Sequence, residues 1–259
     1  PHLVAGPIGR ASHLVPQFKA VPRLTRGMVA TALILICWGL FKKTVVASEL
    51  ATGLVDKTFF DPSAQTGLDL ALGAYGYAVQ IYCDFSAYSD MAVGLAALLG
   101  YRFPRNFDQP YRATSLQDFW RRWHISLSQW LRDYLYKSLG GNRGGSLFTY
   151  RNLMITMVLG GLWHGAAWTF VIWGALHGIF LVVERLLKTV VSFKITAWNG
   201  IILALATYTC VNFTWVFFRA RKFETAQNIA NIAQQGGSKG WTQSGRHHED
   251  DEETNCNGH

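Results

Sequence analysis

The longest stretch of the chain without a formally charged side chain covers residues 152–183, and its length restricts the folds that are available. A straight helix of these 32 residues would be about 48 Å long, because an α-helix rises 1.5 Å per residue. The hydrocarbon layer of a bilayer is only about 30 Å thick. The segment therefore has to tilt strongly, extend beyond that layer, or break.

Three glycines mark where this segment is expected to break: Gly160, Gly161 and Gly165. His164 lies among them, in the sequence GGLWHGAAW. Non-helical backbone at membrane depth is tolerated only where protein buries it or where it lines a water-filled cavity. We therefore expect His164 to line a cavity rather than to face lipid. Spacing alone leaves an alternative equally open, in which His164 is a hydrogen-bonded packing residue and Trp163 and Trp168 are interfacial anchors.

Three other segments are apolar enough to enter a membrane: residues 25–46, 68–100 and 195–218. Charged residues make up 15% of the chain, against about 25% in ordinary soluble proteins. Because each segment can supply a helix of about 20 residues, the sequence predicts an all-α fold, a polytopic membrane helical bundle with a central cavity. Residues 56–66 are expected to form a loop between two of these segments.

Charge and cysteine spacing exclude two classes of partner. The formal net charge is +8, but the basic residues flank the apolar segments, as expected for anchors at an anionic cytoplasmic surface. No RNA-binding signature lies among them, so we expect no nucleic-acid partner. The four cysteines are dispersed and form no C-x-x-C pair, so no metal site is expected.

Two carboxylates, Asp84 and Asp90, interrupt the apolar residues 68–100. A carboxylate at the centre of a bilayer costs on the order of 3 kcal/mol on insertion scales. Such groups face a polar interior or mark the end of a span. We favour the second interpretation, in which the sequence CDFSAYSD is an interfacial break, and we expect both carboxylates to be structural.

Residues 116–136 are predicted to form one amphipathic helix. Two capping-box patterns precede it, T-x-x-Q from Thr114 and S-x-x-D from Ser115. Its apolar residues give a broad face, but it carries too many charges to cross lipid as a simple span. It should lie at the interface or pack inside the bundle, and the glycine-rich residues 139–146 should end it. His124 lies in this helix, among tryptophans and arginines.

Histidines within apolar surroundings suggest proton chemistry, because imidazole titrates close to neutral pH. His164 is the strongest candidate, whereas His177 is more simply explained by packing. The chain contains no G-x-S-x-G, P-loop or H-E-x-x-H motif. The attacking nucleophile would therefore come from a substrate and not from this chain.

Two runs of sequence resemble the membrane-bound O-acyltransferase (MBOAT) family: FWRRWHISLSQWLRDYLYKSLGGNRGG and NLMITMVLGGLWHGAAWTFVIWGALHG. The runs PHLVAGPIGR and YCDFSAYSDMAVGLAALLGYRFPRNFDQPY add to the likeness. They look most like the bacterial branch that contains the alginate O-acetyltransferase membrane subunit. The resemblance implies a multi-helix membrane fold with a central cavity. It also implies that His164 matches the active-site histidine and that His124 matches the polar residue of the second motif.

The same resemblance implies a reaction and a location. The acyl donor would be a cytoplasmic thioester, acetyl-CoA in this branch, with no metal. The acceptor would be a hydroxyl of an exopolysaccharide such as alginate, or of a periplasmic or extracellular acetyl-accepting protein. We expect His164 to be the general base, and His124 to orient the acceptor or stabilise the developing oxyanion. The protein would be a multi-pass protein of the bacterial inner membrane.

Residues 1–235 are expected to form a partial acyltransferase domain that lacks the family's N-terminal and C-terminal spans. Residues 236–259 are glycine-rich and then acidic, and we expect them to be a disordered tail. Two rival functions stay open on the residues alone. One is a proton-coupled membrane transporter, and the other is a non-catalytic scaffold subunit of an export complex.

Overall fold

The computed structural model describes residues 6–19, 24–190, 196–220 and 229, and every regular element in these ranges is a helix. Three helical segments are long and apolar enough to cross a membrane: Arg26–Phe60, Trp168–Val190 and Trp198–Arg219. The prediction of an all-α membrane protein is therefore confirmed for the described part of the chain. The predicted tail, residues 236–259, lies outside the described residues.

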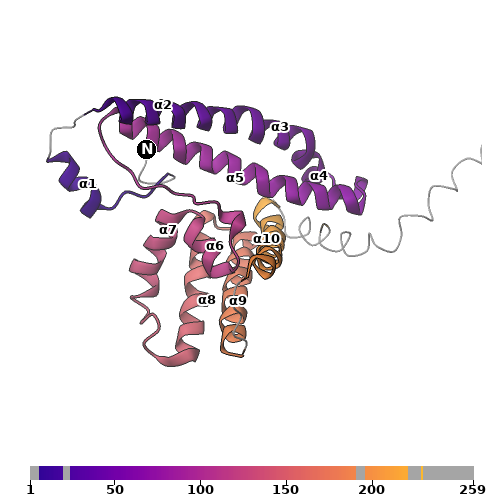
Figure 1. The fold of residues 1–259 in the computed structure, drawn as a ribbon. Helices are drawn as coiled ribbons and strands as arrows, with labels where there is room; N and C mark the ends of the chain where they lie inside the picture. The colour runs from indigo at the N-terminus through magenta and orange to yellow at the C-terminus, as the bar shows by residue number, and fades with distance from the viewer. Residues whose placement is uncertain (1–5, 20–23, 191–195, 221–228, 230–259) are drawn as a thin grey trace, which may run out of the picture.

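One group of helices is a long antiparallel pair. α2 (Arg26–Phe41) continues through α3 (Ser48–Leu50) and α4 (Asp56–Phe60), and the chain returns as α5 (Gly67–Leu98). Figure 1 shows α5 alongside α2, α3 and α4, with α1 (Ala11–Phe18) near one end of the pair. Two π-helical turns join the pieces of the first helix, and a 3₁₀ turn precedes α5: Lys42–Ala47, Ala51–Val55 and Pro62–Ala64.

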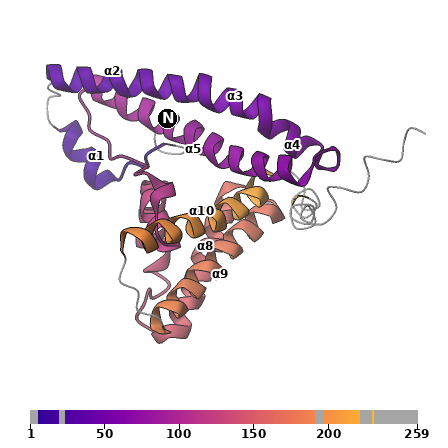
Figure 2. The same cartoon turned by 45° about the vertical axis from the view of Figure 1, so that its right-hand side comes forward.

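The second group contains α6 (Leu116–Arg122), α7 (Ile125–Trp130), α8 (Gly145–His164), α9 (Trp168–Val190) and α10 (Ala197–Arg219). A 3₁₀ turn lies before α6 and a π-helical segment extends α7: Pro110–Arg112 and Leu131–Tyr136. Figures 1 and 2 show α8 and α9 side by side, with α10 packed against α9 and reaching α5. An aromatic core fills the place where α5, α6, α9 and α10 meet: Phe119, Trp123, Trp173 and Trp215.

The uncharged segment 152–183 breaks where its glycines predict, and the break is a full reversal of the chain. α8 ends at His164, and α9 begins at Trp168 and packs back along α8. The two backbones are nearly in contact. A Cβ atom on Gly161 would lie 2.2 Å from the carbonyl oxygen of Phe170, and one on Gly174 would lie 2.4 Å from that of Met157.

The predicted break at CDFSAYSD is wrong, because α5 runs unbroken through Asp84 and Asp90. Two lysines on the neighbouring helix neutralise these carboxylates. Lys42 Nζ donates hydrogen bonds to Asp90 Oδ2 at 2.7 Å and to Ser86 Oγ at 2.8 Å, and Lys43 pairs with Asp84. A helix can retain charges inside an apolar segment when an adjacent helix supplies the partners. The expectation that both carboxylates are structural agrees with these pairs.

Two other boundaries differ from the prediction. Residues 56–66 are not all loop, since the helix continues to Phe60 in α4. Residues 116–136 do not form one amphipathic helix, because the chain breaks at Trp123 and His124 between α6 and α7. The start of that segment is as predicted, with Ser115 Oγ accepting a hydrogen bond from the Asp118 amide at 3.1 Å.

The two lysine pairs differ in burial and therefore in expected contribution. The Lys42 side chain is 9% exposed, whereas that of Lys43 is 52% exposed. Lys42→Met should lower the free energy of unfolding by about 1–3 kcal/mol, because Ser86 and the partly buried Asp90 lose their charged partner. Lys43→Met should change it by about 1 kcal/mol or less. The apparent melting temperatures of the two purified variants are measured in detergent. Equal decreases for Lys42→Met and Lys43→Met would contradict the expected difference between the two ion pairs.

The contact between α8 and α9 gives a second prediction. Gly174→Ala should lower the apparent melting temperature, because the added methyl group meets the Met157 backbone and overpacking costs about 1–3 kcal/mol. Gly27→Ala in α2 is the matched control, since nothing lies within 4 Å of its Cβ position. That variant should melt at or above the wild-type temperature. If Gly174→Ala melts at the wild-type temperature, α8 and α9 are further apart than this structure places them.

Candidate active site

His164 is the last residue of α8, at the reversal of the chain, and it is half-buried. Its imidazole lies against aromatic rings of the next two helices. The ring centroids are 5.3 Å from Trp173 on α9 and 5.1 Å from Phe218 on α10. The described residues provide no hydrogen bond to its ring nitrogens. The hydrogen bond expected of a packing histidine is thus absent from the described residues, and both interpretations of His164 stay predictions.

His124 lies between α6 and α7 in a left-handed backbone conformation, with a φ of 41°. This conformation is unfavourable for a residue with a Cβ, by about 1–3 kcal/mol. The loop that follows α5 holds it there, because the amide of Ile125 donates to the Asn106 carbonyl oxygen at 2.9 Å. The break in the predicted helix thus depends on a contact with a residue 18 positions earlier in the chain.

The hydrogen bonds of Asn106 define the tautomer of His124. Asn106 Oδ1 accepts from the Ser126 amide at 3.1 Å and from Ser126 Oγ at 2.8 Å, and it lies 3.2 Å from His124 Nδ1. The amide of Ser126 can only donate, so the Asn106 atom is an oxygen and His124 Nδ1 carries the proton. His124 Nε2 is then a lone-pair acceptor. It is buried and has no partner among the described residues.

Burial, and secondly the nearby His164, lower the pKa of the His124 imidazole to about 3. The ring is only 2% exposed and is therefore neutral at pH 7. A neutral ring whose Nε2 has no partner among the described residues can accept a hydrogen bond from a ligand hydroxyl. It cannot donate to an oxyanion from that nitrogen. Of the two roles predicted for His124, this tautomer favours orientation of the acceptor.

The structure brings His124 and His164 into one aromatic cluster. Trp163 contacts both, with its ring centroid 6.2 Å from that of His124 and 5.0 Å from that of His164. Phe85 of α5 closes the other side of His124 at 4.7 Å, edge to face. The two predicted site residues are therefore neighbours, although they belong to different helices.

His177 has the packing role predicted for it. Thr214 Oγ1 donates its proton to the Val211 carbonyl oxygen at 2.7 Å, so it accepts from His177 Nε2 at 2.9 Å. This bond joins α9 to α10 in the core, where His177 is fully buried. Its Nδ1 has no partner among the described residues.

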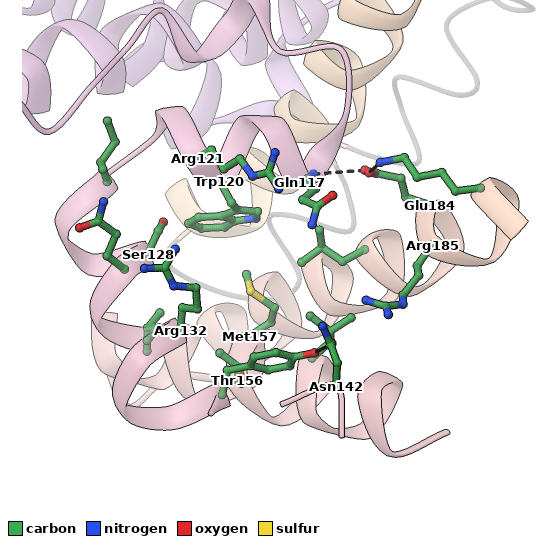
Figure 3. Close-up of a pocket in the computed structure, with 17 residues that line it drawn as sticks. Gln117, Trp120, Arg121, Ser128, Arg132, Asn142, Thr156, Met157, Glu184 and Arg185 are labelled. Carbon is green, nitrogen blue, oxygen red and sulfur yellow. Dashed lines mark hydrogen bonds and ion pairs between the residues drawn. The ribbon is translucent and has the colours of Figure 1, made fainter. Parts of the chain in front are cut away.

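A cavity of about 410 Å³ opens between α6, α7 and its π-helical extension, α8 and α9. Figure 3 shows Trp120 and Arg121 on one wall, Arg132 on another, and Arg185 on α9. Neither His164 nor His124 is among the residues that line it. The expectation that His164 lines a central cavity thus stays a prediction. Within the described residues, no group of three His, Cys, Asp or Glu side chains could hold a metal ion.

Two residues of this region were not predicted. Asn106 fixes His124, and Arg185 lines the cavity. Asn106 lies in a polar loop with two nearby prolines, and the sequence gives no sign that the loop folds back onto α5. Arg185 follows an uncharged span, where basic residues are predicted only as interfacial anchors. Both roles depend on contacts between helices that are distant in the sequence.

Comparison with known proteins identifies the family. The model of the membrane-bound O-acyltransferase family matches residues 1–220. The chain belongs to this family. It is 49% identical over 226 residues to a probable alginate O-acetylase of Azotobacter vinelandii, covering 87% of this chain and 44% of that protein.

More distant relatives carry related names. The chain is 42% identical over 237 residues to a peptidoglycan O-acetyltransferase of Helicobacter pylori, covering 88% of the chain and 44% of the relative. It is 31% identical over 196 residues to a teichoic acid D-alanyltransferase of Streptococcus thermophilus, covering 71% of the chain and 47% of the relative. The chain thus spans less than half the length of these family members. Family membership and membrane location agree with the predictions.

The Asn106 contacts can be tested directly. Asn106→Leu removes the acceptor shared by His124 Nδ1 and Ser126, and each buried donor left unpaired costs about 1–3 kcal/mol. The apparent melting temperature should fall clearly. Ser89→Ala is the milder control, since it removes only the partner of Asn106 Nδ2, at 3.2 Å. If Asn106→Leu melts like Ser89→Ala, the shared acceptor does not stabilise the site.

Proposed function

We propose that this chain is part of an O-acyltransferase of the bacterial inner membrane. It transfers an acetyl or related acyl group from a cytoplasmic thioester to a hydroxyl of an exported polysaccharide or of a partner protein outside the cytoplasm. The names of its relatives support acyl transfer to cell-envelope polymers. The observation that carries the proposal is that half-buried His164 and a neutral His124 contact the same ring, that of Trp163, and that His124 Nε2 has no partner among the described residues.

His164 acts as the general base. Its neutral imidazole removes the proton of the acceptor hydroxyl while the oxygen attacks the thioester carbonyl. The tetrahedral intermediate collapses, the carbon–sulfur bond breaks, and the departing thiolate takes up the proton from the imidazolium. General-base assistance contributes typically about 10²–10⁴-fold to the rate. Holding donor and acceptor in reactive geometry adds to this.

His124 orients the acceptor. A sugar carries several hydroxyl groups, so one can be attacked through His164 while a neighbouring one donates a hydrogen bond to His124 Nε2. The rigid bonds from Asn106 keep that nitrogen in place, and a positioned group of this kind costs little reorganisation during the reaction. An acceptor without adjacent hydroxyl groups could not form this second hydrogen bond, so its acetylation would depend less on His124.

Acetyl-CoA is the proposed donor, since several relatives are named as probable alginate O-acetylases. The D-alanyltransferase relatives indicate that the family scaffold accepts more than one acyl group. The acceptor polymer in this chain is proposed by class only: an exopolysaccharide or another cell-envelope glycan.

The proposal predicts that His164→Ala in the full-length protein lowers acetyl transfer to the exported polymer by about 10²–10⁴-fold. His124→Gln should also lower acetyl transfer, because the acceptor loses the hydrogen bond that orients it. His13→Ala is the matched control, since His13 is exposed on α1, and it should transfer normally. Transfer is measured as polymer-bound acetate at equal membrane abundance. Normal acetylation by His164→Ala would exclude His164 as the base and favour a transporter or scaffold function.

A further inference from the structure

Lys42 is a buried cation that the proposed reaction does not use. Its side chain is 9% exposed, and it lies in the longest of the three helical segments that are apolar enough to cross a membrane. An ionisable group within such a segment is costly, and it is retained as a rule where it serves a function. Apolar residues can replace a buried ion pair with little loss of stability, and often with a gain. Stability alone therefore gives little reason for an ammonium group at this position.

The ammonium group of Lys42 holds two residues of α5 that are about one helical turn apart. Lys42 Nζ donates hydrogen bonds to Ser86 Oγ at 2.8 Å and to Asp90 Oδ2 at 2.7 Å. The helices are in close contact here, because a Cβ atom on Gly39 would lie 2.9 Å from the carbonyl oxygen of Ala87. Residues i and i+4 share one face of a helix. One side chain of α2 thus fixes how α5 is rotated about its own axis.

The residues that precede Ser86 and Asp90 in the chain support His124. The ring of Phe85 lies edge to face against the imidazole, with a centroid distance of 4.7 Å. Ser89 Oγ accepts a hydrogen bond from Asn106 Nδ2 at 3.2 Å, and Asn106 Oδ1 lies 3.2 Å from His124 Nδ1. Ser89, Asn106 and His124 are each 2% exposed, so water does not compete for these contacts.

The register of α5 connects the two sets of contacts. Residues 85 and 89 contact His124 and its partner, whereas residues 86 and 90 bond to Lys42. Successive residues of an α-helix are about 100° apart around the axis. A rotation of α5 that breaks the Lys42 bonds therefore also moves Phe85 and Ser89 relative to the imidazole. Lys42 is coupled in this way to a histidine of the other group of helices (Figure 1).

We propose that Lys42 is a positioning residue, which holds α5 in the rotation that keeps His124 protonated on Nδ1 and its Nε2 ready to accept from the acceptor hydroxyl. This inference rests on the proposed function, because it presumes that His124 orients the acceptor. Without Lys42, Asn106 loses the fixed position of its partner on α5 and can turn its amide group. The amide nitrogen of Asn106 then faces the imidazole, and the second tautomer of His124 becomes populated. Lys43 has no such part, since it pairs with Asp84 and is 52% exposed.

The tautomer of His124 can be measured independently of the reaction. The readout is the solid-state nitrogen-15 NMR spectrum of the full-length protein, labelled on histidine and embedded in lipid bilayers. His124→Gln identifies the signal of this residue by its loss. The wild type should show one neutral tautomer with Nδ1 protonated, and Lys42→Met should show a mixture of the two tautomers. Lys42→Arg should restore the wild-type signal, because a guanidinium group can donate to both oxygens on α5.

Acetyl transfer tests the consequence for the reaction. Lys42→Met should lower the rate by about tenfold or more at equal membrane abundance, because misplacing a positioned group by about 1 Å can cost about 10²-fold. The loss should not exceed that of His124→Gln. The double variant should be no slower than His124→Gln alone, since Lys42 acts through this imidazole. A purely structural role of Lys42 would add its own loss to that of His124→Gln.

Two further variants keep the test decisive. Lys43→Met is the matched control, because it removes the more exposed ion pair of the same helix. It should keep the wild-type tautomer signal and the wild-type rate. Ser86→Ala removes one of the two Lys42 bonds and keeps the ion pair with Asp90. It carries the test if Lys42→Met does not accumulate in the membrane, and it should produce a smaller fraction of the second tautomer.

A wild-type tautomer signal in Lys42→Met, or in Ser86→Ala where only that variant accumulates, would overturn the inference. Losses of Lys42→Met and His124→Gln that multiply in the double variant would overturn it as well. Normal acetyl transfer by His164→Ala would instead overturn the proposed function. The tautomer signal would still show in that case whether Lys42 positions His124.

Discussion

Residues 152–183 carry no formal charge and are too long to cross the apolar layer of a membrane as one straight helix. The arrangement of the candidate site depends on how the chain breaks within this segment. It reverses at Gly165, and the glycines on both sides let α8 and α9 approach until their backbones nearly touch. A side chain at the end of α8 then contacts rings of α9 and α10. His164 occupies that position. The imidazole is thus available at the reversal because the helix ends there.

The second imidazole, that of His124, is placed in the same region by a different structural feature. His124 lies between α6 and α7 in a left-handed conformation that a regular helix would not allow, and Asn106 holds both its backbone neighbour and its ring. Asn106 is in turn anchored to α5 through Ser89. The long helix pair therefore determines the tautomer of a histidine in the other group. A scaffold that fixes a neutral imidazole with a free nitrogen is suited to guiding a hydroxyl.

Some of this could be predicted from the sequence, because the signals are local. Three glycines around a histidine predict a break, and the Ser115 cap predicts the start of α6. The errors arise where the decisive partner is distant. Asp84 and Asp90 do not break α5, because Lys42 and Lys43 of another helix neutralise them. The single helix predicted over residues 116–136 is broken by a loop that precedes it.

The central claim is that His124 and His164 serve one reaction, and a double-mutant cycle on the rate of acetyl transfer tests it most directly. The full-length protein is compared as wild type, His124→Gln, His164→Ala and the double variant, at equal membrane abundance. If both imidazoles act on the same step, the double variant will be hardly slower than the slower single variant, because either loss already disables that step. If the two losses multiply instead, the histidines act independently and the account is wrong.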